Sequence, residues 1–196
     1  MTPSRDPIFP GARAPRRSGK RTGWPRRPAL VRPRPGVPNE VIVSVGGRTL
    51  RATMGRTGIR TIKREGDGAT PRGRITPLAG LTRARRVLPL ACRRVRGSDG
   101  WCEDPASLMY NRFVRRPAPA AHETMARTDA LYDVVLATDH NRRPRIRGGG
   151  SAIFFHVARP AMTPTEGCLA FPSAAWQRAV VPLGPYLIGI DPRPCR

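Results

Sequence analysis

The sequence predicts a mainly β domain. Three observations support this class: many short strand-like runs, few helix-like runs, and no alternation of strands with long helices. With 196 residues the chain is long enough for one domain with its own core. We expect that domain to span residues 40–196.

The first 39 residues are rich in proline and arginine and poor in aromatic and β-branched residues. Such a segment cannot bury enough apolar surface to offset the entropy lost on ordering. We therefore expect residues 1–39 to be a disordered basic tail. Its arginine pairs, Arg16-Arg17 and Arg26-Arg27, suggest twin-arginine export only weakly, because no apolar stretch follows them.

After the tail, β-branched and alternating runs mark the expected strands, and Gly46-Gly47 supplies a hairpin turn. The expected strands are 41–45, 48–54, 75–81, 131–137, 151–157 and 186–190. Short helices are expected at 121–130 and 173–180. Turn residues interrupt 55–73 and 142–150, so these should be loops. Residues 92–122 have no clear period and predict a long irregular insert.

The formal charge is +23, and nearly every cation is arginine, with lysine only at positions 20 and 63. This charge predicts a salt-sensitive attraction to polyanions. No aromatic-basic motif of a nucleic-acid-binding module is present, so we expect no specific nucleic-acid partner. A basic nucleic-acid-binding protein stays an alternative that depends on charge alone. The glycine-rich loop 63–73 lacks the G-K-[ST] ending of a nucleotide-binding loop.

Four cysteines occur, at positions 92, 102, 168 and 195. None forms a C-x-x-C pair, and no Cys/His cluster has zinc-binding spacing, so we expect neither a metal nor a cofactor. For Cys92 and Cys102 we expect free thiols, although an oxidising compartment would favour a disulfide. No apolar run approaches the roughly 20 residues of a membrane span.

One pair of residues has the chemistry of a nucleophile and its base. His156 ends the strongest strand-like run, and Cys168 follows a loop and a glycine, Gly167. An imidazole can take the thiol proton and later return it to a leaving group. The glycine permits close backbone approach near a developing oxyanion. From spacing alone, a small buried cysteine and a hydrogen-bonded edge histidine are the commoner explanation.

Four ordered sequence blocks resemble those of the YkuD-type L,D-transpeptidases, in particular a subgroup of short bacterial proteins. The resemblance covers roughly residues 40–190. The blocks are K-R-E-G-D-G-A-T-P-R-G at 63–73, W-C-E-D-P at 101–105 with Y-N-R at 110–112, L-Y-D-V-V at 131–135, and S-A-I-F-F-H-V-A-R-P at 151–160 with T-E-G-C at 165–168.

The resemblance implies a mixed-strand β-sandwich with one or two short helices. It implies that Cys168 is the nucleophile, which takes the acyl group of a peptidoglycan stem peptide as a thioester. His156 would be the proton donor and acceptor, and the backbone amides of Gly167 and Cys168 would lie near the oxyanion. The substrate class would place the enzyme in the cell envelope, while the missing signal peptide leaves a cytoplasmic location open.

The chain departs from the common S-H-G-C-x-R form of this family at two positions, Glu166 and Ala170. Without the usual arginine, Arg159 or Arg64 is the candidate to hold a donor carboxylate, because guanidinium pairs bidentately with it. A third group could orient His156, as in a catalytic triad. The candidates for that role are Glu103, Asp104 and Asn111.

Two reactions share the expected thioester. An amine acceptor would resolve it in an L,D-transpeptidase, and water would resolve it in an L,D-carboxypeptidase acting on muropeptides. The sequence barely discriminates between them: the resemblance makes the L,D-transpeptidase the leading hypothesis, while the missing signal peptide leans towards a carboxypeptidase acting on cytosolic muropeptides. The acceptor, the cross-link type and the oligomeric state stay open. A catalytically inactive relative that binds the cell wall is a further alternative.

Overall fold

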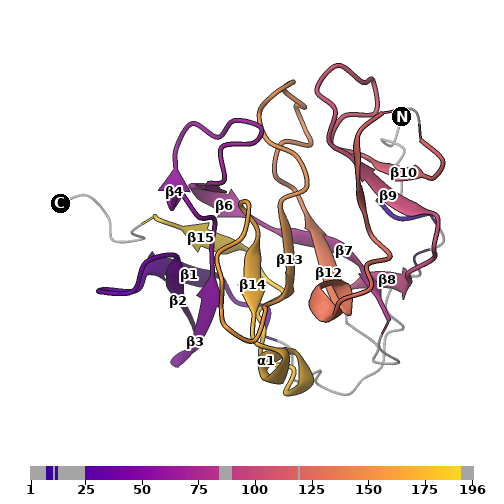
Figure 1. Ribbon diagram of the computed structural model, residues 1–196. Coiled ribbons are helices and arrows are strands. Elements are labelled where there is room, and N and C mark those ends of the chain that lie inside the picture. Colours follow the sequence, from indigo (N-terminus) through magenta and orange to yellow (C-terminus); the bar gives the residue numbers. More distant parts are fainter. Residues whose placement is uncertain (1–7, 11, 13–24, 84–89, 119, 191–196) are drawn as a thin grey trace, which may run out of the picture.

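The chain is built almost entirely from strands, as the sequence predicts. The computed structural model describes residues 8–10, 12, 25–83, 90–118 and 120–190 (Figure 1). Two short helices occur in these ranges, a 3₁₀ helix at Ala130–Tyr132 and α1 at Ser173–Gln177. The strands are β1 (Ala29–Pro33), β2 (Glu40–Val45), β3 (Arg48–Thr53), β4 (Ile59–Arg60), β5 (Thr70–Pro71), β6 (Gly73–Ile75), β7 (Pro77–Thr82), β8 (Ala91–Arg94), β9 (Asp99–Cys102), β10 (Phe113–Arg115), β11 (His122–Thr124), β12 (Val134–Thr138), β13 (Phe154–Val157), β14 (Leu169–Phe171) and β15 (Tyr186–Ile188).

A mixed ten-stranded sheet forms the body of the molecule. Its strand order is β6-β15-β1-β2-β3-β14-β13-β12-β7-β8. Strand β6 ends at Ile75 and β7 begins at Pro77, so one edge strand is continuous in the chain with the ninth strand of the same sheet. The sheet must therefore curl back towards itself. It surrounds a large apolar core to which Val43, Phe155 and Tyr186 belong.

A second apolar core lies on the other face of the same strands. In β12, Val134 and Leu136 belong to the large core, while Val135 and Ala137 belong to the second core. Strand side chains alternate between the two faces, and all five β12 residues are buried, which explains the uninterrupted apolar sequence. The three-stranded sheet β10-β9-β11 contributes Trp101 to this core.

The predicted boundary at residue 40 is wrong, because part of the expected tail is folded. Strand β1 pairs antiparallel with β2 and parallel with β15. Its Ala29 and Val31 are fully buried. This alternation of buried residues is too short to recognise in a sequence rich in proline and arginine. Phe9 is also buried and meets Trp101 edge-on, with ring centroids 6.0 Å apart. Residues 1–7 and 13–24 of the expected tail lie outside the described residues.

The predicted irregular insert at 92–122 and helix at 121–130 are also wrong. The insert contributes β8 to the large sheet and forms β9 and β10 of the small sheet. The segment expected to be helical begins with β11, which is extended because it pairs antiparallel with β9. The remaining helical turn is confined to Ala130–Tyr132, where the Asp129 carboxylate accepts a hydrogen bond from the Leu131 N–H.

Other predictions are confirmed with shifted ends. The 41–54 hairpin forms β2 and β3, with both turn glycines at positive φ. The last strand and the helix at 173–180 are present but shorter than expected. Cys92, Cys102 and Cys168 are free thiols, and Cys195 lies outside the described residues. No helix among the described residues is long and apolar enough to cross a membrane.

Candidate active site

Two adjacent strands near the middle of the large sheet carry the predicted reactive pair (Figure 1). Strand β13 contains His156, and Cys168 directly precedes β14. The strands run parallel, with His156 opposite Ala170. Because Phe155 and Leu169 belong to the large core, strand alternation places His156 and Cys168 on the opposite face. Strand spacing and rise put their Cα atoms about 8 Å apart.

Both side chains line one cleft of about 440 Å³. The cleft also contains Arg159, one of the two arginines predicted to hold a substrate carboxylate. Arg64, the other, is exposed and lies outside the cleft lining, although its neighbours Lys63 and Glu65 belong to it. The charged groups that line the cleft are Lys63, Glu65, Glu103, Glu123, Arg127, Arg159 and Glu166.

The thiol of Cys168 is held by backbone groups rather than by His156. Its S–H donates to the Ala152 carbonyl at 3.2 Å, and the sulfur accepts the Phe154 N–H at 3.3 Å. Desolvation raises the pKa of this thiol to about 12, only partly opposed by the Phe154 hydrogen bond. Cys168 is therefore a neutral thiol at neutral pH.

His156 is buried, with 5% of its surface exposed. Its Nδ1 lies 2.8 Å from the Val157 carbonyl, and because a carbonyl only accepts, Nδ1 must carry the proton. The Nε2 atom then bears the lone pair of a neutral imidazole. Burial lowers the pKa of His156 to about 4, so the ring stays a free base at neutral pH. Tyr132 packs edge-on against it, with ring centroids 5.4 Å apart.

A backbone carbonyl thus orients His156 through Nδ1, and two of the three side chains proposed for that role are engaged elsewhere. Asp104 caps a turn through the Ala106 N–H at 2.9 Å. Asn111 accepts hydrogen bonds from the indole N–H of Trp101 at 2.9 Å and from the Ala152 N–H at 3.2 Å. Glu103 lines the cleft, where burial and the nearby Glu123 and Glu65 raise its pKa to about 7.

Gly167 has a backbone conformation that favours glycine, with φ +137°. A Cβ at this position would lie 2.7 Å from the Ala69 carbonyl oxygen, which is too close for any side chain. Its N–H donates to the Thr165 hydroxyl at 3.1 Å, so the amide predicted to face an oxyanion is engaged within its own loop. The glycine therefore has a clear structural role in placing Cys168.

Two threonines that the sequence did not single out hold the cysteine loop. The Thr165 hydroxyl donates to the Cys168 carbonyl at 2.6 Å. The buried Thr70 hydroxyl donates to the Gly167 carbonyl at 2.9 Å and accepts the Gly55 N–H at 2.8 Å. Both lie in the quoted family-like blocks, which is the only signal that could have identified them. Through Thr70, the 63–73 segment is joined to the loop that carries Cys168.

Glu166, which replaces the usual histidine before the Gly-Cys pair, faces solvent. Its carboxylate pairs with Arg56 at 3.0 Å, and both side chains are at least half exposed. Surface pairs of this kind contribute little stability. Glu166 therefore forms part of the rim of the cleft, where its carboxylate is engaged by Arg56.

No group of three or more His, Cys, Asp or Glu side chains placed to hold a metal ion occurs among the described residues. No family model matches the chain, and comparisons with curated proteins and with solved structures also give no match.

Proposed function

We propose that this protein catalyses cysteine-dependent acyl transfer on peptidoglycan stem peptides, as an L,D-transpeptidase. One observation carries the proposal. His156 in β13 and Cys168, just before the parallel neighbour β14, lie on the same face of the sheet and line one cleft. The resemblance of the surrounding blocks to YkuD-type enzymes supplies the substrate class. A merely structural cysteine and histidine would have no need to share an accessible cleft.

The reaction starts from a neutral pair. As the sulfur of Cys168 attacks the carbonyl of the third stem residue, its proton passes to Nε2 of His156. A carbon–sulfur bond forms, the amide bond to the terminal D-alanine breaks, and His156 returns the proton to the leaving amine. An acceptor amine then attacks the thioester, gives up a proton through His156, and restores the thiol.

The charges of the cleft suit a zwitterionic peptide. Arg159 is exposed and has no carboxylate within ion-pair distance among the described residues, so it is available to a substrate carboxylate. Lys63 and Arg127, by contrast, pair with Asp67 at 2.6 Å and Asp129 at 2.7 Å. The glutamates that line the cleft favour an ammonium group on the same substrate or on the acceptor.

The proposal is tested with a tetrapeptide muropeptide, incubated with and without an amine acceptor and followed by mass spectrometry. We expect a cross-linked product that needs the acceptor, together with a trapped acyl-enzyme on Cys168. The Cys168→Ala variant should form neither. Tripeptide as the sole product in both reactions would indicate an L,D-carboxypeptidase, and activity that survives Cys168→Ala would refute the mechanism.

A further inference from the structure

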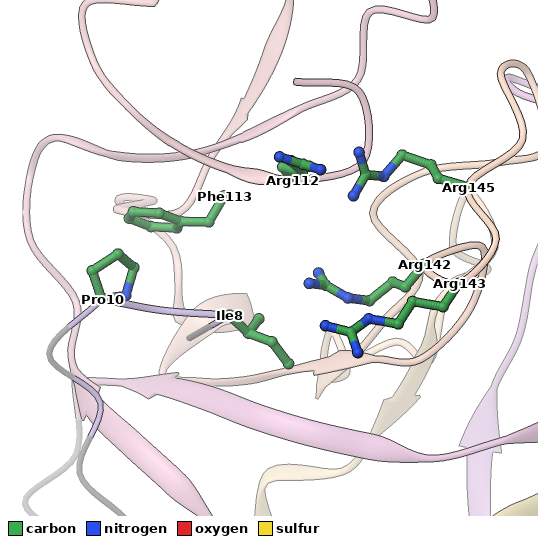
Figure 2. Close-up of a pocket in the computed structure, with 7 residues that line it drawn as sticks. All are labelled: Ile8, Pro10, Arg112, Phe113, Arg142, Arg143 and Arg145. Atoms are coloured by element: carbon green, nitrogen blue, oxygen red, sulfur yellow. The ribbon is translucent and has the colours of Figure 1, made fainter. Parts of the chain in front are cut away.

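A second hollow of about 440 Å³ shares no lining residue with the cleft of Cys168 and His156. Four arginines line it together with three apolar residues, and no acidic residue belongs to its lining. Figure 2 shows the guanidinium groups facing a common space from two sides, with the apolar residues closing a third side. The lining residues are Ile8, Pro10, Arg112, Phe113, Arg142, Arg143 and Arg145.

Two loops far apart in sequence bring these arginines together, and asparagine side chains fix both loops. Asn111, which precedes the first arginine, donates through its amide to the carbonyls of His140 at 3.1 Å and Asn141 at 2.9 Å. Asn141 in turn accepts the Ile146 N–H at 2.7 Å and donates to the Ile146 carbonyl at 2.8 Å. The loop that carries the other three arginines is therefore organised before any ligand arrives.

Three of the four arginines that line this hollow have no acidic partner among the described residues. Within the described part of the chain, Arg112, Arg143 and Arg145 have no carboxylate within 4.0 Å. The Nε of Arg145 is buried and has no hydrogen-bond partner there. Burial, and then the nearby charge of Arg112, lower the pKa of Arg145. Because Arg112, Arg143 and Arg145 repel one another around one space, an anion bound between them would relieve that repulsion.

The chemistry of the lining narrows the class of anion. Guanidinium groups bind phosphate and carboxylate oxygens in bidentate pairs, and several around one space match a ligand with several charges. The hollow is much larger than one phosphate group, and Phe113, Ile8 and Pro10 offer an apolar wall to the rest of a ligand. We propose that this four-arginine hollow binds the di- or triphosphate group of a small organic phosphate.

The proposal is tested by calorimetric titration of the whole 196-residue chain at constant ionic strength. The ligands are inorganic pyrophosphate, tripolyphosphate, a nucleoside diphosphate and citrate, which matches pyrophosphate in charge at pH 8. We expect pyrophosphate to bind at least about tenfold more tightly than citrate. A nucleoside diphosphate that binds more tightly than pyrophosphate would show that the apolar wall also contacts the ligand. Equal affinities for these two ligands would show that only the phosphate groups are bound.

Matched variants separate the hollow from the general positive charge. In the site variant, Arg112→Gln with Arg145→Gln, pyrophosphate affinity should fall at least about tenfold, because charge-assisted hydrogen bonds are lost. The control, Arg48→Gln with Arg94→Gln, removes the same charge from exposed positions and should bind as the wild type does. The lysine variant, Arg112→Lys with Arg145→Lys, keeps the charge and should bind with intermediate affinity.

Two results would overturn the proposal. Equal losses in the site variant and its control would assign the binding to overall charge, and equal affinities for citrate and pyrophosphate would remove the preference for phosphate. Thermal unfolding without ligand guards against misfolding of the site variant. Its midpoint should match or exceed that of the wild type, because the substitution relieves repulsion between like charges.

Discussion

At the scale of single residues, the reactive pair combines two opposite pKa shifts with one cause. Desolvation raises the pKa of Cys168 to about 12 and lowers that of His156 to about 4. Both shifts favour the uncharged form, so the protein at rest holds a thiol and an imidazole rather than a thiolate–imidazolium pair. Under the proposed mechanism, nucleophilic character would develop as substrate displaces the Ala152 carbonyl from the S–H and the proton moves to His156.

This resting state predicts slow alkylation of Cys168. With a pKa of about 12, its thiolate fraction at pH 8 is about 10⁻⁴, against roughly a quarter for an ordinary free thiol. Iodoacetamide should therefore modify Cys168 more than about 100-fold more slowly than glutathione in the same tube. The rate should rise about tenfold per pH unit between pH 7 and 10. Mass-spectrometric peptide mapping measures it, and fast, pH-independent alkylation would instead indicate a thiolate–imidazolium pair.

At the scale of elements, local pattern predicted the strands with clean alternation or dense β-branching. The β2–β3 hairpin has both features and a Gly-Gly turn. Strand β13 was predicted to begin at Ser151 but begins at Phe154. Ala152 has φ +51°, which ends regular pairing and aims its carbonyl at the Cys168 thiol. The contact with Cys168 thus decides the local backbone conformation, although the apolar sequence predicts a strand, and this position belongs to the candidate site.

The elements that sequence reasoning missed are those defined by distant partners. Strand β9 has partners on both sides, and its short sequence has no period of its own. The same limit applies to the candidate site. Cys168 and His156 could be proposed from residue type and order, whereas the Thr70 contact joins residues 97 positions apart and leaves no local pattern. Such side-chain-to-backbone contacts need the folded chain to be identified.

The Thr70 contact gives a prediction for the loop that carries Cys168. Thr70→Val keeps the side-chain shape and leaves the Gly55 N–H and the Gly167 carbonyl without their buried partner. Each unsatisfied group costs about 1–3 kcal/mol, so the free energy of unfolding should fall by at least that amount. Thr70→Ser keeps the hydroxyl and should lose less. Urea denaturation of both variants measures this, and a larger loss in Thr70→Ser than in Thr70→Val would show that the methyl group, not the hydroxyl, matters.

At the scale of the whole molecule, one buried ion pair joins the two larger sheets. Arg93 of β8 donates from Nη1 and Nη2 to the two carboxylate oxygens of Asp99 in β9, each at 2.8 Å. The Arg96 N–H donates to the same carboxylate at 2.7 Å. Both side chains of the pair are at least 93% buried. This bidentate pair fixes the small sheet, and with it Trp101 and the neighbouring Glu103, against the large sheet.

Removal of either partner should be strongly destabilising, because the other charge stays buried without compensation. We expect Asp99→Ala and Arg93→Ala each to lower the free energy of unfolding by about 3–5 kcal/mol. The double variant should lose much less than the sum, since it leaves neither charge unpaired. Chemical denaturation of all four proteins completes the cycle. For comparison, Glu166→Ala breaks the exposed ion pair with Arg56 and should lower the free energy of unfolding by less than about 1 kcal/mol. Additive losses at Arg93 and Asp99 would mean that the sheets are held together by the apolar contacts of Trp101 and Phe154, whose rings lie 5.1 Å apart, rather than by this ion pair.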